Sequence, residues 1–112
     1  SAQRTDLTNP VVTFYRDGAA TSRLRAPSGS IDMKTHDVDT WGGVQVVTTD
    51  STTLTTDKLR YDAQTRKISS KDHVTLDKPD SITEGEGLMT DPELHDVTIG
   101  HQTVRMKHAA RK

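Results

Sequence analysis

Residues 43–61 read GVQVVTTDSTTLTTDKLRY, and residues 72–99, DHVTLDKPDSITEGEGLMTDPELHDVTI, repeat their pattern of apolar, threonine and aspartate positions. The two copies are offset by about 28 to 30 residues, a period that is typical of stacked repeat architectures. Apolar and polar residues alternate within each copy, which indicates strands rather than helices. The repeat therefore predicts an elongated sheet with an apolar interior seam and open ends. The equivalent pairs are Val44 and Val74, Leu54 and Ile82, and Leu59 and Leu88.

The composition is that of a small, ordered, strand-rich domain. Of the 112 residues, 30% are hydrophobic and the formal net charge is −1, far from the high net charge of disordered chains. Threonine (18 residues) and aspartate (13) greatly outnumber glutamate (3), and they suit strands and turns respectively. No cysteine is present, which excludes a disulfide scaffold and thiolate metal sites. The 15 Lys and Arg residues are dispersed and balanced by acids, so no nucleic-acid partner is expected.

Turn signals between short apolar runs predict a single all-β domain without a helix longer than two turns. We expect residues 1–6 to form a flexible N-terminal segment, residues 7–107 to form the β domain, and residues 108–112 to form a basic tail. No segment is apolar enough to span a bilayer. The expected strands lie near residues 11–15, 22–26, 31–34, 44–48, 52–56, 58–62, 66–70, 73–77, 81–84, 86–90, 95–100 and 102–107.

One face of these strands supplies medium-sized aliphatic side chains and few aromatic ones. Such an interior is able to close as a dry core, and it is equally able to hold a flexible acyl chain, which has the same chemistry. The residue pattern alone leaves both interpretations open. The single tryptophan, Trp41, is interpreted as a core-packing residue near the sheet rim. The inward set, which is also the candidate lipid-binding set, is Phe14, Leu24, Ile31, Met33, Val44, Val46, Leu54, Leu59, Tyr61, Ile68, Val74, Leu76, Ile82, Leu88, Val97 and Ile99.

No combination of residues indicates catalysis or a metal site. The five histidines are scattered without the spacing of metal ligands, and we interpret them as surface residues. Asp37 and Asp39 share one strand face, as carboxylates of calcium sites and glycosidases sometimes do, but without a further acidic partner we expect them to be solvated. We therefore expect no catalytic residue, no metal and no cofactor. Four glycines are expected to serve the backbone at strand starts: Gly42, Gly43, Gly85 and Gly87.

The order and spacing of four motifs give the chain a resemblance to a known family. Residues 7–106 resemble LptC, the periplasmic, membrane-anchored component of the lipopolysaccharide export machine, and the OstA/LptA proteins share its repeat. The resemblance implies an open, twisted β-jellyroll, which is a V-shaped antiparallel sheet with an acyl-binding interior, and it implies no enzymatic activity. The motifs are residues 41–46 (WGGVQV), 54–61 (LTTDKLRY), 68–74 (ISSKDHV) and 82–88 (ITEGEGL).

The resemblance also implies partners and a location. A protein of this family accepts lipopolysaccharide from the inner-membrane ATP-binding-cassette transporter, LptB-LptF-LptG, and passes it to an LptA-like periplasmic protein. The family's N-terminal transmembrane helix is absent from this sequence, so we expect either a portion of a membrane-anchored periplasmic protein or a soluble relative. Terminal strands carry unpaired backbone groups, which makes them templates for edge-to-edge addition of a partner strand. The expected edge residues are Val11, Val12, Thr13, Phe14, Val97, Thr98, Ile99 and Val104.

Three other functions compete with this one. A soluble LptA/OstA-like bridge protein would share the fold and the lipid, whereas a structural β-solenoid would share the repeat but keep a dry interior. A carbohydrate-binding β-sandwich, or an enzyme of that fold, needs exposed aromatic side chains, and the chain has four aromatic residues in all. Binding of an apolar dye or of lipopolysaccharide separates the lipid carriers from the structural protein.

Overall fold

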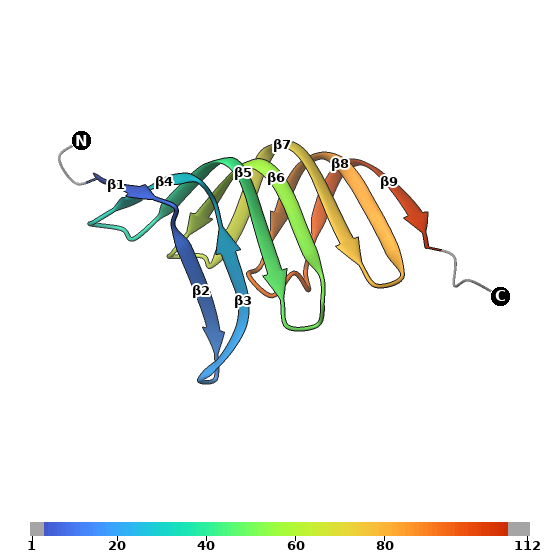
Figure 1. Cartoon of the computed structure of the whole chain (residues 1–112), viewed down its shortest axis with the longest axis horizontal. Coiled ribbons are helices and arrows are strands. Elements are labelled where there is room, and N and C mark those ends of the chain that lie inside the picture. Colours follow the sequence, from blue (N-terminus) through green and yellow to red (C-terminus); the bar gives the residue numbers. More distant parts are fainter. Residues whose placement is uncertain (1–3, 108–112) are drawn as a thin grey trace.

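The computed structural model describes residues 4–107, and the regular elements of these residues are all β-strands (Figure 1). The strands lie side by side along a body of 57 × 31 × 24 Å, with β1 and β9 at opposite ends. None of the described residues belongs to a helix that could cross a membrane. In chain order the strands are β1 (Arg4–Thr8), β2 (Val11–Arg16), β3 (Ala19–Arg25), β4 (Ser28–Asp32), β5 (Val38–Thr48), β6 (Thr53–Asp62), β7 (Lys67–Lys78), β8 (Ser81–Thr90) and β9 (Thr98–Met106).

The nine strands form one antiparallel sheet in the order β1-β4-β5-β6-β7-β8-β9, with β2 and β3 attached beside β5. Two strands share the same side of β5. Its first half pairs with β4, where Val38 faces Ile31, and its second half pairs with β3, where Val46 faces Leu24. The sheet therefore divides beyond β5 into two branches, β4 with β1 and β3 with β2.

Each long strand bends near its middle, and the bends line up across the sheet. Register shifts interrupt the pairing near residues 42–43 of β5, 57–59 of β6, 71–72 of β7 and 85–87 of β8. A bulge bends its strand and increases the local twist, so a row of bulges folds the sheet along one line. Gly42 and Gly43 permit the bend in β5, because their φ angles of +94° and +103° lie in a region that favours glycine.

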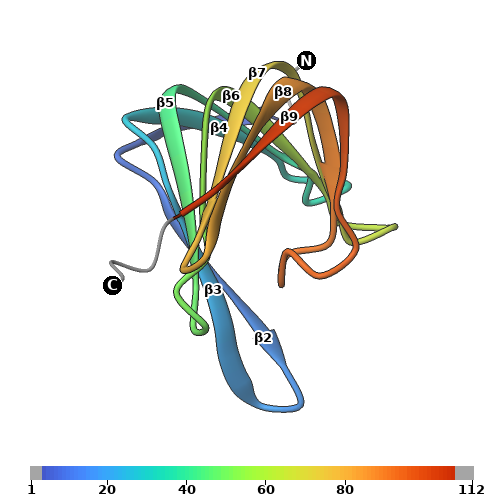
Figure 2. The same ribbon diagram turned by 90° about the vertical axis from the view of Figure 1, so that its right-hand side faces the viewer.

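The fold line separates two leaves that face each other, and Figure 2 shows the resulting arch, which is open below. We call one the β3 leaf: it consists of β2, β3 and the adjoining halves of β5–β9, such as residues 44–48 and 73–78. We call the other the β4 leaf: it consists of β1, β4 and the remaining halves, such as residues 38–41 and 67–70. Each of the strands β5–β9 thus contributes to both leaves.

Side chains from both leaves meet inside the arch. Phe14 of β2 contacts Tyr61 of β6 from the opposite leaf, with ring centroids 4.9 Å apart. Within each leaf the antiparallel register aligns inward residues across the strands, so the core runs along the whole seam. One such row across four neighbouring strands of the β3 leaf is Leu24, Val46, Leu54 and Leu76.

Several boundaries differ from the sequence prediction. Residues 4–6, expected to be flexible, belong to β1, in which Thr5 pairs with Ile31 of β4. Three expected pairs of short strands are continuous and form β6, β7 and β8, because a bulge bends a strand without ending it. The strand expected at 95–100 begins at Thr98. The expected basic tail, residues 108–112, lies outside the described residues.

Candidate functional site: the apolar interior

The inside of the arch collects most of the predicted lipid-binding side chains. Eleven of the sixteen belong to one continuous cluster in which no side chain is more than 9% exposed. Tyr61 and Val97 are partly buried and pack against it, and Ile31 and Ile82 are half-buried. The role of these residues in lipid binding remains a prediction. The eleven are Phe14, Leu24, Val44, Val46, Leu54, Leu59, Ile68, Val74, Leu76, Leu88 and Ile99.

Two side chains that were expected inside the protein are exposed. Met33, predicted as an inward residue, is 53% exposed. It lies in the turn after β4, where the Asp32 carboxylate accepts hydrogen bonds from the backbone N–H groups of Lys34 and Thr35. This turn ends the alternation of inward and outward side chains. Trp41, expected to pack in the core, is 39% exposed on the outer face of β5. Its neighbour Thr40 takes the inward position instead and donates its hydroxyl to the carbonyl oxygen of Leu59 at 2.9 Å.

Three buried apolar residues were not predicted: Ala26, Val38 and Leu94. Val38 stands between two outward aspartates, and this polar-apolar-polar alternation is a signal that the sequence does contain. Leu94 lies in the loop after β8, outside any strand, and is 4% exposed within the core cluster. Its only sequence signal is an apolar residue in an otherwise polar segment, which does not by itself indicate burial.

The chemistry of the interior suits hydrocarbon. Thr56, buried beside the cluster, donates its hydroxyl to the carbonyl oxygen of His73 at 2.9 Å, so it is already satisfied. Glu93 is the one ionisable residue of the described chain that is buried. An apolar lining makes favourable contacts with an acyl chain, but it offers a charged group no hydrogen bond or ion pair to replace the water that the group loses. The two leaves are in contact, because four of the lining residues are completely inaccessible to solvent. These are Val46, Leu54, Ile68 and Val74.

Two surface grooves lie on the outer faces of the sheet. The larger, of about 820 Å³, is on the β4 leaf and is lined mainly by residues of the outer face, such as Trp41, Lys58 and Met89. The second, of about 410 Å³, is on the β3 leaf and is lined by residues such as Arg23 and Arg25. Of the buried core cluster, only Leu59 and Leu88 contribute to the lining of these two grooves, so neither groove follows the aliphatic seam along its length.

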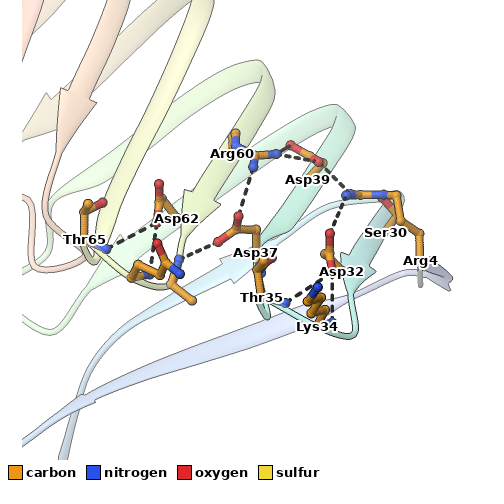
Figure 3. A network of polar contacts seen from close by, with 12 residues as sticks. Arg4, Ser30, Asp32, Lys34, Thr35, Asp37, Asp39, Arg60, Asp62 and Thr65 are labelled. Atoms are coloured by element: carbon orange, nitrogen blue, oxygen red, sulfur yellow. Dashed lines mark hydrogen bonds and ion pairs between the residues drawn. The ribbon is translucent and has the colours of Figure 1, made fainter. Parts of the chain in front are cut away.

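Ion pairs on the outer face of the β4 leaf account for Asp37, which immediately precedes β5, and for Asp39 of β5 (Figure 3). Arg60 donates to Asp37 at 3.0 Å and to both carboxylate oxygens of Asp39 at 2.9 and 3.0 Å. Arg4 of β1 donates to Asp39 at 2.6 Å. These carboxylates, expected to be solvated, are bound by guanidinium groups. In the part of the chain that the structure describes, no group of three or more His, Asp or Glu residues could hold a metal ion.

His73 forms a second polar cluster on the outer face, across β7, β8 and β9. Its Nδ1 lies 2.9 Å from Glu86 Oε2, and its Nε2 lies 3.3 Å from Glu84 Oε1. Arg105 donates to the other carboxylate oxygen of Glu84 at 2.9 Å. The contact with Glu86 is the main reason that the pKa of His73 is raised above its ordinary value of 6.5, and Glu84 adds to the effect. The cluster ties the last three strands together.

Each strand at an end of the sheet has one edge without a partner strand in the described residues. Within residues 4–107, β9 pairs only with β8 and β2 pairs only with β3. Residues 100–107 are all exposed. A third edge strand, β1, pairs only with β4 in the same range and was not predicted. Of the predicted edge residues, Val11, Val12, Thr13 and Phe14 lie on β2, Thr98, Ile99 and Val104 lie on β9, and Val97 precedes β9.

Comparison with known proteins agrees with this architecture. A family model described as "Lipopolysaccharide-assembly, LptC-related" matches residues 1–106. Among solved structures, the crystal structure of LptH, the LptA-homologous periplasmic component of the lipopolysaccharide transport device from Pseudomonas aeruginosa, matches with a TM-score of 0.62. The match covers 94% of each chain at 12% sequence identity and confirms the predicted open β-jellyroll fold. No curated protein sequence gives a significant match.

Proposed function

This chain belongs to the LptC-related lipopolysaccharide-assembly family, and we propose that it carries lipopolysaccharide through the periplasm with the acyl chains held between its two leaves. In this role it accepts the lipid from the inner-membrane transporter LptB-LptF-LptG and passes it to an LptA-like protein. Its native form is anchored to the inner membrane by a helix outside this sequence. It acts as a carrier and has no catalytic role.

The observation that carries the proposal is the aliphatic seam. Thirteen buried apolar side chains form one cluster that draws on both leaves and extends across β2 to β9. A seam of this kind is longer than a compact core of the same size, and its lining matches a hydrocarbon chain in polarity. The seam ends at free strand edges, so a second jellyroll that joined there would continue both the sheet and the seam.

The edge strands support the transfer step. Within residues 4–107, no strand pairs with the backbone N–H and C=O groups along the outer edge of β9, and such a row is a template for a strand from another chain. We propose that β9 pairs with an edge strand of the LptA-like protein and that β2 and β1, the edge strands of the two leaves at the other end of the sheet, face the inner-membrane complex. Backbone pairing then aligns the two apolar interiors without any need for matching side chains.

Photocrosslinking tests the carrier function directly. p-Benzoylphenylalanine in place of Tyr61 puts a reactive aromatic ring where a partly buried aromatic ring already packs against the cluster. We expect irradiation with lipopolysaccharide to give a covalent adduct that is detected on an immunoblot. The same group at Thr55, which is exposed on β6, is the control and should give none. Adducts of equal yield at both positions, or none at either, would contradict binding between the leaves.

One observation favours a related second function, that of a soluble bridge protein. Both ends of the sheet have free edges within the described residues, so copies could add to one another from β9 to β2. A bridge protein of this type forms longer chains as its concentration rises, whereas a carrier capped by its membrane complex does not need to. Light scattering coupled to size-exclusion chromatography over a concentration series distinguishes the two. A monomer at all concentrations argues against the bridge.

A further inference from the structure

The loop between β8 and β9 lies at the open side of the arch (Figure 2). Three consecutive residues of this loop, Pro92, Glu93 and Leu94, are buried, although connecting segments normally run exposed over the surface. Leu94 belongs to the same apolar cluster as side chains of both leaves. The loop therefore fills part of the interior from the open side.

Glu93 holds this loop to both leaves. Its Oε2 accepts a hydrogen bond from the Thr21 hydroxyl at 3.0 Å and lies 3.5 Å from the Nη2 of Arg66. Thr21 belongs to β3, in the β3 leaf, whereas Arg66 lies in the turn between β6 and β7, at the margin of the β4 leaf. One carboxylate thus joins the margins of both leaves across the opening, and we call these two contacts the Glu93 latch.

The latch is incompletely satisfied. Glu93 is 4% exposed, and its second oxygen, Oε1, is buried without a hydrogen-bond partner in the described chain. The hydroxyl oxygen of Ser22, adjacent to Thr21, is buried without a partner as well. A buried polar atom that has lost water and found no partner raises the free energy of the closed arrangement. The closed arch is therefore easier to open here than at a fully paired contact.

The loop is held together by its own hydrogen bonds. The Asp91 carboxylate accepts the backbone N–H groups of His95 at 2.9 Å and Asp96 at 3.0 Å, and the Asp91 carbonyl oxygen accepts that of Leu94 at 3.0 Å. None of these bonds crosses to another strand. The loop is therefore able to swing away as one body, at the cost of the latch contacts and of the apolar contacts of Leu94.

We infer that a hydrocarbon chain enters the interior between the β2–β3 hairpin and the β8–β9 loop, by displacing Leu94 and releasing Glu93 from Thr21. This entry site rests on the proposed function, which supplies the acyl chain. The apolar contacts that Leu94 loses are replaced by those of the ligand, because an aliphatic ligand takes the place of an aliphatic side chain in the same apolar surroundings. The released Glu93 regains water, so the opened state has no buried carboxylate to compensate.

A reversible crosslink tests the entry site. The chain has no cysteine, so Thr21→Cys with Glu93→Cys introduces two thiols that a short bis-methanethiosulfonate reagent joins until dithiothreitol is added. Lipopolysaccharide and the apolar dye N-phenyl-1-naphthylamine are the two probes. We expect the crosslink to abolish binding of both and the reductant to restore it. The matched control is Thr55→Cys with Thr75→Cys, which face each other on β6 and β7, and its crosslink should leave binding unchanged.

A second variant weakens the latch without a crosslink. Thr21→Val removes the hydroxyl donor while it keeps the branched shape, and leaves the buried carboxylate with fewer partners. The closed state becomes less populated, so the apparent Kd for lipopolysaccharide should fall by about tenfold. Thr55→Val, at an exposed position of β6, should leave the Kd unchanged. An unchanged or higher Kd in Thr21→Val would overturn the latch.

The two probes separate this entry site from the proposed function. If the crosslink excludes the dye while lipopolysaccharide fails to bind even the reduced protein, the entry site stands and lipopolysaccharide carriage is wrong. If lipopolysaccharide binds the crosslinked and the reduced protein equally well, carriage stands and the entry site is wrong. If neither probe binds the reduced protein, both are wrong.

Discussion

Phe14 and Tyr61 meet edge to face across the inside of the arch, with ring centroids 4.9 Å apart and ring planes at 62°. Aromatic rings favour this geometry, because the edge of one ring faces the electron-rich face of the other. Phe14 comes from β2, which pairs with the sheet only through β3 in the described chain, and Tyr61 comes from the opposite leaf. The pair therefore holds the β2–β3 hairpin against the leaf that it does not belong to.

Removal of the Phe14 ring should destabilise the whole domain. Phe14 is 5% exposed, and a buried Phe→Ala change typically lowers the free energy of unfolding by about 3–5 kcal/mol. Urea unfolding followed by circular dichroism measures the change. The neighbouring Tyr15 is 60% exposed, so Tyr15→Ala should change the free energy by no more than about 0.5 kcal/mol. Similar losses in both variants would show that the hairpin does not depend on the inward ring.

Gly85 should tolerate no side chain, for a steric reason. A Cβ atom on Gly85 would overlap the carbonyl oxygen of Gly100 and a methyl carbon of Ile99. Both atoms belong to β9, so Gly85→Ala has to push β9 away from β8. We expect faster amide hydrogen exchange throughout β9, measured by mass spectrometry. Gly18→Ala is the control, because no atom lies within 4 Å of its added Cβ, and exchange in β9 should stay unchanged there.

The repeat predicts the register of the sheet only between bulges. Val44 and Val74 were aligned as equivalents, and they occupy one row, since both pair with Thr56. Leu54 was aligned with Ile82, but its row passes through Leu76 to Thr83, one position further on. A shift of one residue turns a side chain to the other face, which explains why Ile82 is only half-buried.

The alternation of apolar and polar residues does not predict which residues are buried outside the strands. Leu94 and Glu93 are buried because a loop folds back over the seam, and no periodic sequence pattern predicts a loop of that kind. The pairing of β1 depends in part on Arg4, a polar residue in a segment without apolar alternation. The strand-borne part of the interior was therefore predictable, whereas its cover and its N-terminal edge were not.

Arg4 should anchor β1. It donates to Ser30 at 2.6 Å and to Asp39 at 2.6 Å, which are contacts from the first strand to β4 and β5 (Figure 3). Arg4→Met should speed amide exchange in β1 and lower the free energy of unfolding by about 1 kcal/mol or less, because the network is partly exposed to solvent. Added salt should shrink the difference from the parent. Arg16→Met, at an exposed position of β2, should leave exchange in β1 unchanged, and an equal effect would contradict the anchor.

His73 should make stability depend on pH above its ordinary titration range. Its pKa in the folded protein is raised, chiefly by Glu86, so the folded state binds a proton more tightly than the unfolded state, in which the value is near 6.5. This contribution is fully present below 6.5 and is lost as the pH rises through the folded pKa. Titration of the His73 ring protons by nuclear magnetic resonance checks the direction, and Glu86→Gln should bring the pKa down toward 6.5. A folded pKa below 6.5 in the parent would contradict the ion-pair geometry.

Proline substitutions in β9 should distinguish the strand edge that pairs with β8 from the edge that binds a partner. Successive N–H groups of a strand point to opposite edges, so one of the neighbours Thr103 and Val104 donates toward β8 and the other toward the free edge. Proline at the inward N–H should break the β8–β9 pairing and lower the melting temperature, whereas proline at the outward N–H is tolerated in an edge strand. If β9 receives a strand of an LptA-like partner, the outward proline variant stays folded and loses partner binding in a pull-down. Thr103→Ala and Val104→Ala keep their N–H groups and should bind as the parent does. A folded proline variant at each position, with binding equal to that of the parent, would show that the partner docks elsewhere.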